Sequence, residues 1–309
     1  MEPVYEYVYA VKTLRSFTEA SKHLNITQPA LSIAIKKLED KIGHPIFDRD
    51  AKPIALTPAG EILFSFIEDL ILLEANTRAA LEELDNWKVG NIIIGATQYF
   101  TAFILPKYIS KFAESHPKAR ITIIERSAAQ LPELLENNEI NLIFSLEQFN
   151  LEKYALHKGI TDYVFISIPK DFIKNDSLRK YALTREEIIS TKYEDLKAIP
   201  SLNDLSKIPF VILRPGNNLH YRTMMLFQLE GIMPPIKMML DQLTTSHYIS
   251  RFSFAATLTT DRLIKQIHDD GNLLYLKFDH PLMIRNFNIV VKNNCFKSKV
   301  LLDFIDMFQ

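Results

Sequence analysis

The chain has 309 residues, a formal net charge of −1, 47% hydrophobic residues and 24% charged residues. This length predicts about two domains, and the composition favours buried cores over disorder. The single cysteine, Cys295, excludes a disulfide within the chain and a zinc site made of several cysteines, and we expect it to be a small buried apolar residue. A net charge this close to zero also excludes a protein that coats nucleic acid without sequence preference, so any DNA binding must come from a local patch.

The chain shows no export signal and no membrane span. Residues 1–15 mix charged and aromatic side chains and contain neither an apolar signal core nor a small-residue cleavage site. No stretch approaches the ~18 uninterrupted apolar residues of a membrane helix. We therefore expect a soluble protein that lies in the cytoplasm and does not contact a membrane.

Residues 1–58 carry the pattern of a winged helix-turn-helix domain. Apolar residues at helical spacing predict a first helix that ends near Leu14. Ser16 and Glu19 then form a capping box, in which the Ser16 hydroxyl accepts from the Glu19 amide and the Glu19 carboxylate reaches back, so a short second helix begins here. Thr27 caps a third helix, and Pro29 is tolerated in its first turn because that amide has no partner inside the helix.

The third helix has one polar and one apolar face. Gln28, Ser32 and Lys36 lie one helical turn apart and so share its outward face. Such a face suits the major groove, where Gln28 can read an adenine edge, Ser32 is versatile and Lys36 can meet a phosphate. Ile33 also points outward and can meet a thymine methyl group. The alternative is an ordinary solvated helix face. The apolar face is predicted to contain Leu31, Ile35, Leu38 and Ile42.

Gly43 ends this helix, and a wing follows it. Residues 46–47 and 54–56 are predicted to form short strands, and the polar residues 48–53 form the turn between them. Arg49 and Lys52 on this turn are available to phosphates or to the minor groove. Over residues 1–58, eight Lys and Arg residues stand against seven Asp and Glu residues, a net charge of +1, so this weakly basic domain depends on few cations. The expected DNA-contacting residues are Thr27, Gln28, Pro29, Ser32, Ile33, Lys36, Lys37, Arg49 and Lys52.

The order of these residues resembles that of the LysR-type transcriptional regulators. The resemblance is dense over the first sixty residues and implies a DNA-binding winged helix-turn-helix. Ile33 departs from the family, which more often has a polar or basic side chain there, and this affects the expected base preference but not the fold. The residues that carry the resemblance are Phe17-Thr18 with Ala20, 24–32, 35–39, Gly43, 45–49 and 56–60.

A long helix is predicted to begin at Thr57-Pro58 and to end near residue 84. Apolar residues recur along it in an a/d pattern of about three heptads, which predicts a seam between two helices. In the family that the sequence resembles, this helix pairs with that of a second subunit; the alternative is a helix packed on its own domain. Residues 85–90 are predicted to form a hinge with Trp87 as a packing anchor. The predicted seam contains Leu63, Phe66, Leu70, Leu73 and Leu84, and Thr77 weakens it locally.

Residues 91–309 alternate short apolar runs with helical patterns, which favours a parallel sheet covered by helices. Two groups of such units predict two α/β subdomains with a cleft between them. This part resembles the LysR-type effector domain, which is similar to periplasmic solute-binding proteins. The predicted fold is therefore α+β and multidomain. We expect a DNA-binding domain at 1–58, a linker helix and hinge at 59–90, and an effector domain at 91–309, with one subdomain at about 91–161 and 266–309 and the other at about 162–265.

Ligands in such folds lie beyond the carboxyl ends of strands and near helix N-termini. This rule selects polar residues that follow the predicted strands, and residues 244–246, which are predicted to precede a helix. Each of them alone reads as an ordinary cap or loop residue, but the set fits a small polar effector. Arg126 supports an anionic effector and Glu147 opposes one, so its charge stays open. The predicted effector-binding residues are Thr97, Tyr99, Thr101, Ser127, Glu147, Asn218, His220, Thr245 and Ser246.

Two stretches depart from the family pattern. Residues 251–254 are Arg-Phe-Ser-Phe where the family often has glycine, and their bulk is expected to narrow or fill the cleft. Residues 170–200 form a long segment with its own capping pattern, Thr184-x-x-Glu187, which predicts a helical insert. A lid, an oligomer contact and structural decoration are all open for this insert, and decoration is favoured.

No catalytic or metal-binding pattern is present in the sequence. It lacks Gly-x-Gly-x-x-Gly, a phosphate-binding Gly-Lys-Ser/Thr loop and Gly-x-Ser-x-Gly, and its eight histidines show no metal-ligand spacing. We therefore expect no enzyme activity, no cofactor and no metal.

The sequence as a whole predicts a sequence-specific transcription regulator whose DNA binding or bending responds to a small-molecule effector. The expected partners are double-stranded DNA with an interrupted inverted repeat, the effector, further copies of the chain in a dimer or tetramer, and RNA polymerase. The alternative is a small-molecule sensor with degenerate DNA reading, and the intact polar stripe and wing argue against it.

Overall fold

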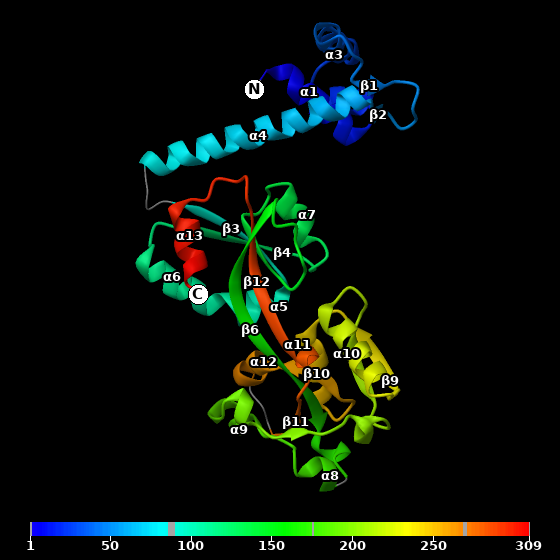
Figure 1. The fold of residues 1–309 in the computed structure, drawn as a ribbon, viewed down its shortest axis with the longest axis vertical. Helices are drawn as coiled ribbons and strands as arrows, with labels where there is room; N and C mark the ends of the chain where they lie inside the picture. Colours follow the sequence, from blue (N-terminus) through cyan, green and yellow to red (C-terminus); the bar gives the residue numbers. More distant parts are fainter. Residues whose placement is uncertain (1, 86–89, 175, 268–270, 309) are drawn as a thin grey trace. The chain divides into compact units, whose positions relative to one another are not determined.

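The computed structural model describes residues 2–85, 90–174, 176–267 and 271–308, and the chain divides into two compact units. The first unit comprises the residues up to Asp85 together with Asn294–Phe296, and its part up to Asp85, called the head, contains a three-helix group, a small antiparallel sheet and one long helix (Figure 1). Its elements are α1 (Pro3–Leu14), α2 (Phe17–His23), α3 (Gln28–Ile42), β1 (Phe47–Asp48), β2 (Ala55–Leu56) and α4 (Pro58–Asp85).

Local capping explains where the short helices begin. The Ser16 hydroxyl accepts from the Glu19 amide at 3.3 Å, and the Thr27 hydroxyl accepts from the Ala30 amide at 3.4 Å, so both predicted N-caps are confirmed. The expected return bond from Glu19 does not form, because its carboxylate binds Lys22 Nζ at 2.8 Å on the helix surface. Only half of the predicted capping box is therefore present.

The core of the head lies between its helices and the small sheet. Leu31, Ile35 and Leu38 are buried as the helical spacing predicts, and each contributes roughly 1.5–3 kcal/mol by leaving water. Ile42 was expected on the same face but is 39% exposed. It is the last residue of α3 before Gly43, whose positive φ turns the chain away, so the end of the helix extends past the core.

Helix α4 begins on the core of the head and continues well beyond it. The Thr57 hydroxyl accepts from the Gly60 amide at 3.0 Å and caps its first turn. A Cβ atom at position 60 would collide with the carbonyl of Ile46, so glycine is required for this close approach. Phe64 and Ile67 are buried against α1, and the Phe64 ring stacks on that of Tyr9 at 5.6 Å. The predicted anchor Trp87 and the side chain of Leu84 lie outside the described residues.

One mixed sheet organises the described part of the C-terminal unit. Its strand order is β4-β3-β5-β12-β6-β11-β7, and β10 also pairs with β6. Strands β3, β4 and β5 are parallel as expected, whereas β12 runs antiparallel to both β5 and β6, so the prediction of a parallel sheet holds for only part of it. The strands are β3 (Asn91–Ala96), β4 (Arg120–Glu125), β5 (Leu142–Ser145), β6 (Tyr154–Pro169), β7 (Ala198–Ile199), β10 (Thr257–Thr260), β11 (Leu273–Phe278) and β12 (Ile284–Lys292).

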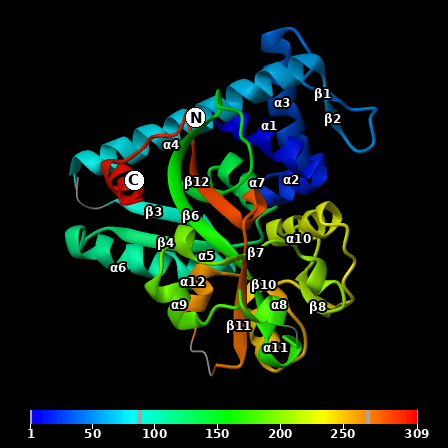
Figure 2. The same ribbon diagram turned by 60° about the horizontal axis from the view of Figure 1, so that its bottom comes forward.

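Strand β6 is 16 residues long and belongs to both halves of this unit (Figures 1 and 2). Residues 154–163 pair with β12, and residues 164–169 pair with β10 and β11. The change of partners lies close to the predicted start of the second subdomain at residue 162. Because β11 pairs only with second-half strands, strand pairing favours a return to the first half near Ile284 rather than at the predicted residue 266.

Helices cover both halves, and a separate two-stranded parallel sheet completes the second half (Figure 2). The first half has α5 (Gln98–Phe103), α6 (Leu105–Ser115), α7 (Leu131–Glu136) and α13 (Lys299–Asp306). The second half has α8 (Asp176–Arg179), α9 (Arg185–Ser190), β8 (Phe210–Leu213), α10 (Asn218–Leu229), β9 (Ile236–Leu240), α11 (Leu243–Arg251) and α12 (Asp261–Gln266). The described helices include none that is both long enough and apolar enough to cross a membrane.

The 170–200 segment packs onto the second half. Its helix α9 begins with the predicted capping box, since the Thr184 hydroxyl accepts from the Glu187 amide and the Glu187 carboxylate accepts from the Thr184 amide. Leu183, Ile188 and Leu196 are buried in one cluster that also contains aromatic residues of β6 and β11. The segment therefore supplies part of the core, which supports structural decoration.

Candidate functional site

The outward face of α3 is exposed as the sequence predicts. Gln28, Lys36 and Lys37 are exposed, Ser32 is half-buried, and Ile33 is 57% exposed. An isoleucine so open to water adds nothing to the core of the head. Its position on the polar face of the helix suits an apolar contact with DNA.

Lys36 and Lys52, two of the cations predicted to contact DNA, are both accessible to a phosphate. Lys36 Nζ lies 3.1 Å from Asp40 Oδ1, and both side chains are mostly exposed, so a phosphate can replace this weak pairing. Lys52 is exposed on the turn between β1 and β2. Both residues can therefore serve as the phosphate contacts that the sequence suggests.

Arg49, another predicted cation, is tied to α3 although its side chain is 45% exposed. Its Nη2 lies 3.1 Å from Glu39 Oε2, its Nη1 donates to Ser32 Oγ at 3.4 Å, and its guanidinium carbon lies 5.3 Å from the centre of the Phe17 ring. Glu39 is 5% exposed, and its other oxygen accepts from the amides of Ile46 and Phe47. Glu39 and Arg49 thus join the wing to α3.

Glu39 is a structural residue of the head that its helical spacing alone does not reveal. The signal was present, because a carboxylate beside Leu38 on the buried face of an amphipathic helix needs a partner, and Arg49 follows in the wing. The other predicted DNA residues are Thr27, whose hydroxyl caps α3, and Pro29, which lies exposed in its first turn. The face predicted to read DNA is therefore largely exposed, and Arg49 joins the wing to it.

The predicted effector-binding residues do not form one contact set in the described structure. Thr97, Tyr99 and Thr101 lie at or in α5, whereas Ser127 and Glu147 are exposed in loops that follow β4 and β5. Residues 244–246 form the first turns of α11 rather than preceding it, because α11 already begins at Leu243.

Several of these side chains are already hydrogen-bonded within the chain. His220 Nδ1 lies 2.7 Å from the Leu213 carbonyl oxygen, and Asn218 Oδ1 accepts from Arg222 Nε at 2.7 Å. Ser246 is fully buried and donates to the Leu243 carbonyl at 2.8 Å. These contacts agree with the alternative that each of these residues is an ordinary cap or loop residue.

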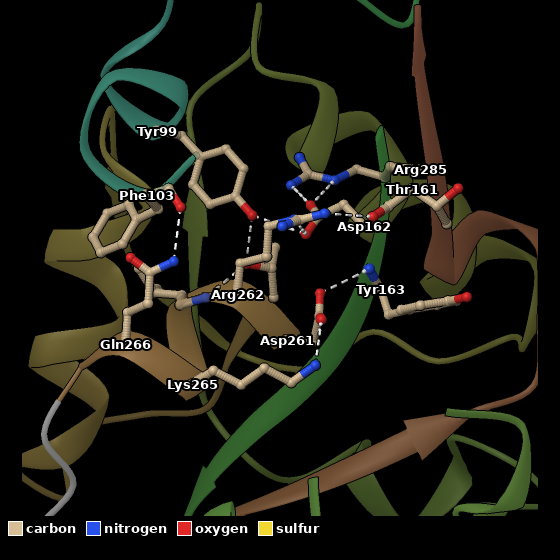
Figure 3. Close-up of polar contacts among 12 residues, drawn as sticks. Tyr99, Phe103, Thr161, Asp162, Tyr163, Asp261, Arg262, Lys265, Gln266 and Arg285 are labelled. Atoms are coloured by element: carbon tan, nitrogen blue, oxygen red, sulfur yellow. Dashed lines mark hydrogen bonds and ion pairs between the residues drawn. The ribbon is translucent and has the colours of Figure 1, made fainter. Parts of the chain in front are cut away.

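Contacts across the two halves instead converge on helix α5 (Figure 3). Gln266 Nε2 of α12 donates to the Phe103 carbonyl at 2.7 Å, and Thr244 Oγ1 of α11 donates to Gln98 Oε1 at 3.4 Å. Both links join the second half to a first-half helix that contains the predicted effector residues Tyr99 and Thr101 and is preceded by Thr97. Helix α5 is therefore bonded to helices of the second half at two points.

A buried polar cluster lies where β6 changes partners (Figure 3). Asp162 of β6 is fully buried and accepts from Arg285 Nε of β12 at 3.0 Å and from the Tyr99 hydroxyl at 2.8 Å. Arg285 Nη2 also donates to the same carboxylate. Arg262 Nε of α12 lies 3.9 Å from it, and Arg262 Nη2 donates to the Thr161 carbonyl at 3.2 Å. Four elements from both halves meet at this one carboxylate.

The hydrogen bonds of the cluster have a defined direction. The Leu263 amide donates to Thr260 Oγ1, and because the Tyr99 hydroxyl donates to Asp162, its oxygen is left to accept from Thr260 at 2.9 Å. Burial raises the pKa of Tyr99 well above its ordinary value, and the Asp162 carboxylate adds to this, so the phenol stays a donor. Tyr99, predicted to contact the effector, is 8% exposed and links α5 to α12.

Residues 251–254 were expected to narrow or fill the cleft with bulky side chains, but the ring of Phe252 does not do so. Phe252 is 84% exposed at the end of α11. Phe254 instead lies beside Lys237, whose Nζ is 4.9 Å from the ring centre and donates to the Phe254 carbonyl at 3.3 Å. The exposed ring of Phe252 therefore points to solvent rather than filling a cleft.

Two protein-family descriptions match the chain. Residues 4–61 match the bacterial regulatory helix-turn-helix protein of the lysR family, and residues 88–309 match the LysR substrate binding domain. The chain belongs to the LysR-type family of transcriptional regulators. This membership confirms the resemblance read from the first sixty residues and the fold expected for the remainder, and it agrees with the expectation that the protein is not an enzyme.

Relatives within the LysR-type family are distant in sequence. An uncharacterized HTH-type transcriptional regulator, YcgK of Bacillus subtilis (strain 168), is 22% identical over 88% of this chain and 83% of its own length. A probable RuBisCO transcriptional regulator of Cyanophora paradoxa is 28% identical over 59% of this chain, and that match spans 57% of the relative.

Solved structures of full-length LysR-type regulators share the fold. CbnR, in a crystal structure with its target DNA, has a TM-score of 0.59 and 16% identity, with 100% of this chain and 99% of that chain covered. OxyR of Pseudomonas aeruginosa has a TM-score of 0.57 and 16% identity, with 99% of this chain and 98% of that chain covered. At these identities the likeness establishes the architecture alone.

Proposed function

We propose that this LysR-type protein is a sequence-specific DNA-binding transcription regulator that responds to a small-molecule effector. The observation that carries the proposal is the intact reading face of α3. Gln28, Ile33 and the two lysines are exposed on it and Ser32 is half-buried, and the ion pair between buried Glu39 and exposed Arg49 joins the wing to it. A head that only stabilised a sensor would need neither feature.

The second candidate is a small-molecule sensor with degenerate DNA reading. The contacts of Arg49 support this candidate. This residue is one of the few cations of the head, and it binds Glu39 and Ser32 instead of being left free for a phosphate. The exposed Lys36, Lys37 and Lys52 argue for the regulator, because they leave the phosphate contacts in place.

We infer self-association through α4. Ile62, Phe66, Leu73 and Leu81 are 76%, 48%, 61% and 57% exposed, so one side of this helix presents an apolar stripe. Leu63 and Leu70, also predicted for the seam, are half-buried, and Leu63 packs on the core of the head. Covering the stripe with the same helix of a second copy would give a dimer, and two heads related by symmetry would read an interrupted inverted repeat. A tetramer requires a second contact between dimers.

The charges around Asp162, where β6 changes strand partners, support an anionic effector. Arg222, Arg262 and Arg285 gather near Asp162, whereas the neighbouring Asp261 is paired with Lys265. Three arginines facing Asp162 leave an excess of positive charge. Burial lowers the pKa of Arg222 and the like charge of Arg285 adds to this effect, whereas Asp162 opposes it. An anion bound near α5 would reduce this excess and would bias the contacts between the halves, which is the coupling that regulation needs.

We place the regulator in the cytoplasm, where it can reach chromosomal DNA. RNA polymerase is the further partner that a regulator of transcription must influence. Neither proposal requires a cofactor or a metal.

The test uses full-length protein and a duplex selected from a random-sequence DNA pool. We expect Ser32→Ala and Lys36→Ala to weaken binding to the selected duplex about threefold to thirtyfold, because each removes one polar contact. Lys36→Ala should also reduce the dependence of affinity on salt, whereas Ser32→Ala should not. Ser115→Ala, an exposed change in the C-terminal unit, is the matched control. Unchanged affinity in both head variants would rule out this reading face.

A further inference from the structure

The Ser32 hydroxyl accepts one hydrogen bond within the head, and its own hydrogen remains available for donation. Its oxygen accepts from Arg49 Nη1 at 3.4 Å. A hydroxyl has two lone pairs and one hydrogen, and among the described residues no group accepts the hydrogen of Ser32. A serine within a helix often donates to the carbonyl one turn back, but Ser32 does not. Its hydrogen is therefore free to be donated to DNA.

Arg49 is fixed where it polarises this hydroxyl. Its guanidinium is bound by the buried carboxylate of Glu39, which the amides of Ile46 and Phe47 hold in place. The Phe17 ring lies beneath the same guanidinium. Moving Arg49 out to a phosphate would leave Glu39 as a buried charge with amide partners alone, which is costly. Arg49 is thus better suited to act on Ser32 than on the DNA backbone.

We propose that Arg49 makes Ser32 a hydrogen-bond donor to DNA, so that this position favours a base with a major-groove acceptor and rejects cytosine. The inference rests on the proposed function. A cation at the hydroxyl oxygen strengthens the O–H donor and repels the hydrogens of a base amino group. Guanine, adenine and thymine present acceptors at N7, O6 or O4, whereas the major-groove edge of cytosine presents only the N4 amino group.

The two wing cations, Arg49 and Lys52, would then have different roles in DNA binding. Lys52 is exposed and would act on phosphates, which carry no sequence information. Arg49 would act through Ser32 and so would affect specificity at one position. A loss of Lys52 should therefore weaken binding to all sequences alike, while a loss of Arg49 should also change which base is preferred.

The experiment begins with full-length protein and a random-sequence duplex pool, followed by affinities for the selected duplex with each base at every half-site position. We expect one position where wild-type protein disfavours cytosine by about threefold to tenfold. Ser32→Ala should remove that preference, and Ser32→Thr, which keeps the hydroxyl, should retain it. Arg49→Gln should remove it as well, and the double variant should remove no more. Lys52→Gln should leave every preference unchanged.

A readout without any protein variant guards against loss of folding in Arg49→Gln. If guanine is selected at the Ser32-dependent position, 7-deazaguanine, which lacks the N7 acceptor, should weaken binding of wild-type protein. Preference for cytosine at that position, or an Arg49→Gln protein that is folded by circular dichroism and keeps the preference, would overturn the inference. A pool from which wild-type protein enriches no sequence would instead contradict the proposed function itself.

Discussion

Asp162 and Arg285 stand directly opposite each other on the antiparallel strands β6 and β12, and their side chains form a buried ion pair. The pair lies at the point where β6 leaves β12 and begins to pair with strands of the second half. Because Tyr99 and Arg262 reach the same carboxylate from α5 and α12, the pair organises the contact between the two halves.

Arg285→Leu should destabilise the C-terminal unit by about 3–5 kcal/mol, because it leaves the carboxylate of Asp162 buried without its main counter-charge. Adding Asp162→Asn to this variant should restore part of the loss, since an uncharged amide costs less to bury and still accepts from Tyr99. Urea unfolding followed by circular dichroism measures both values. A double variant no more stable than Arg285→Leu would contradict this account of the pair.

Tyr99→Phe should loosen the contact between α5 and α12. The variant keeps the ring but removes the hydroxyl that joins Asp162 to Thr260, so we expect a loss of about 1–3 kcal/mol. Hydrogen exchange should quicken at the Leu263 amide, which Thr260 caps. The matched control is Tyr163→Phe, whose exposed hydroxyl donates to Glu194 at 3.4 Å and should matter little. Equal exchange in both variants would exclude Tyr99 as the link.

The contrast between the head and this cluster shows what sequence patterns can predict. Thr27, the Thr184 capping box and the exposed face of α3 depend on residues within a few positions of one another, so spacing alone locates them. Tyr99, Asp162 and Arg285 lie far apart in the chain and meet only through the pairing of β6 with β12. No local pattern contains that pairing.

Ile42 and Tyr99 have surroundings that their positions in the sequence do not reveal. Ile42 has the spacing of a core residue, but α3 ends before the core does. Tyr99 follows a strand as a ligand-contacting residue would, yet its hydroxyl is used by Asp162 and Thr260. The position of a residue after a strand predicts where its backbone lies, but it does not predict which hydrogen-bond partners its side chain has.

His247 should make the stability of the C-terminal unit fall in mild acid. Burial, with a smaller effect from Arg251, lowers the pKa of His247 to about 4, and its Nδ1 lies 3.1 Å from Thr259 Oγ1. Since the unfolded histidine titrates near 6.5, this contribution is fully present above that pH and is lost as the pH falls toward about 4. The loss is on the order of 3 kcal/mol.

The measurement is urea unfolding of wild-type protein and His247→Gln across this pH range. Glutamine cannot take up the proton, so the variant should show a slope that is shallower by about one proton. Parallel curves for the two proteins would contradict the assignment of this pH dependence to His247.

Leu73→Lys should weaken self-association. Leu73 is 61% exposed on the apolar stripe of α4, and a buried lysine would be costly in a seam between two helices. We expect the dissociation constant of the dimer, measured by sedimentation, to rise at least tenfold. Ser65→Lys, also exposed on α4 but outside the stripe, is the control and should leave it unchanged. If both variants dissociate equally, charge rather than the stripe governs assembly.

The central claim is tested most directly by binding of full-length protein to a labelled fragment of the DNA upstream of its own gene and of neighbouring promoters, in a salt series and against a scrambled competitor. We predict binding that survives the competitor and weakens steeply with salt, because Lys36, Lys37 and Lys52 meet phosphates while the α3 face reads bases. Binding that the scrambled competitor abolishes on every fragment would contradict sequence-specific regulation and would favour the sensor with degenerate DNA reading.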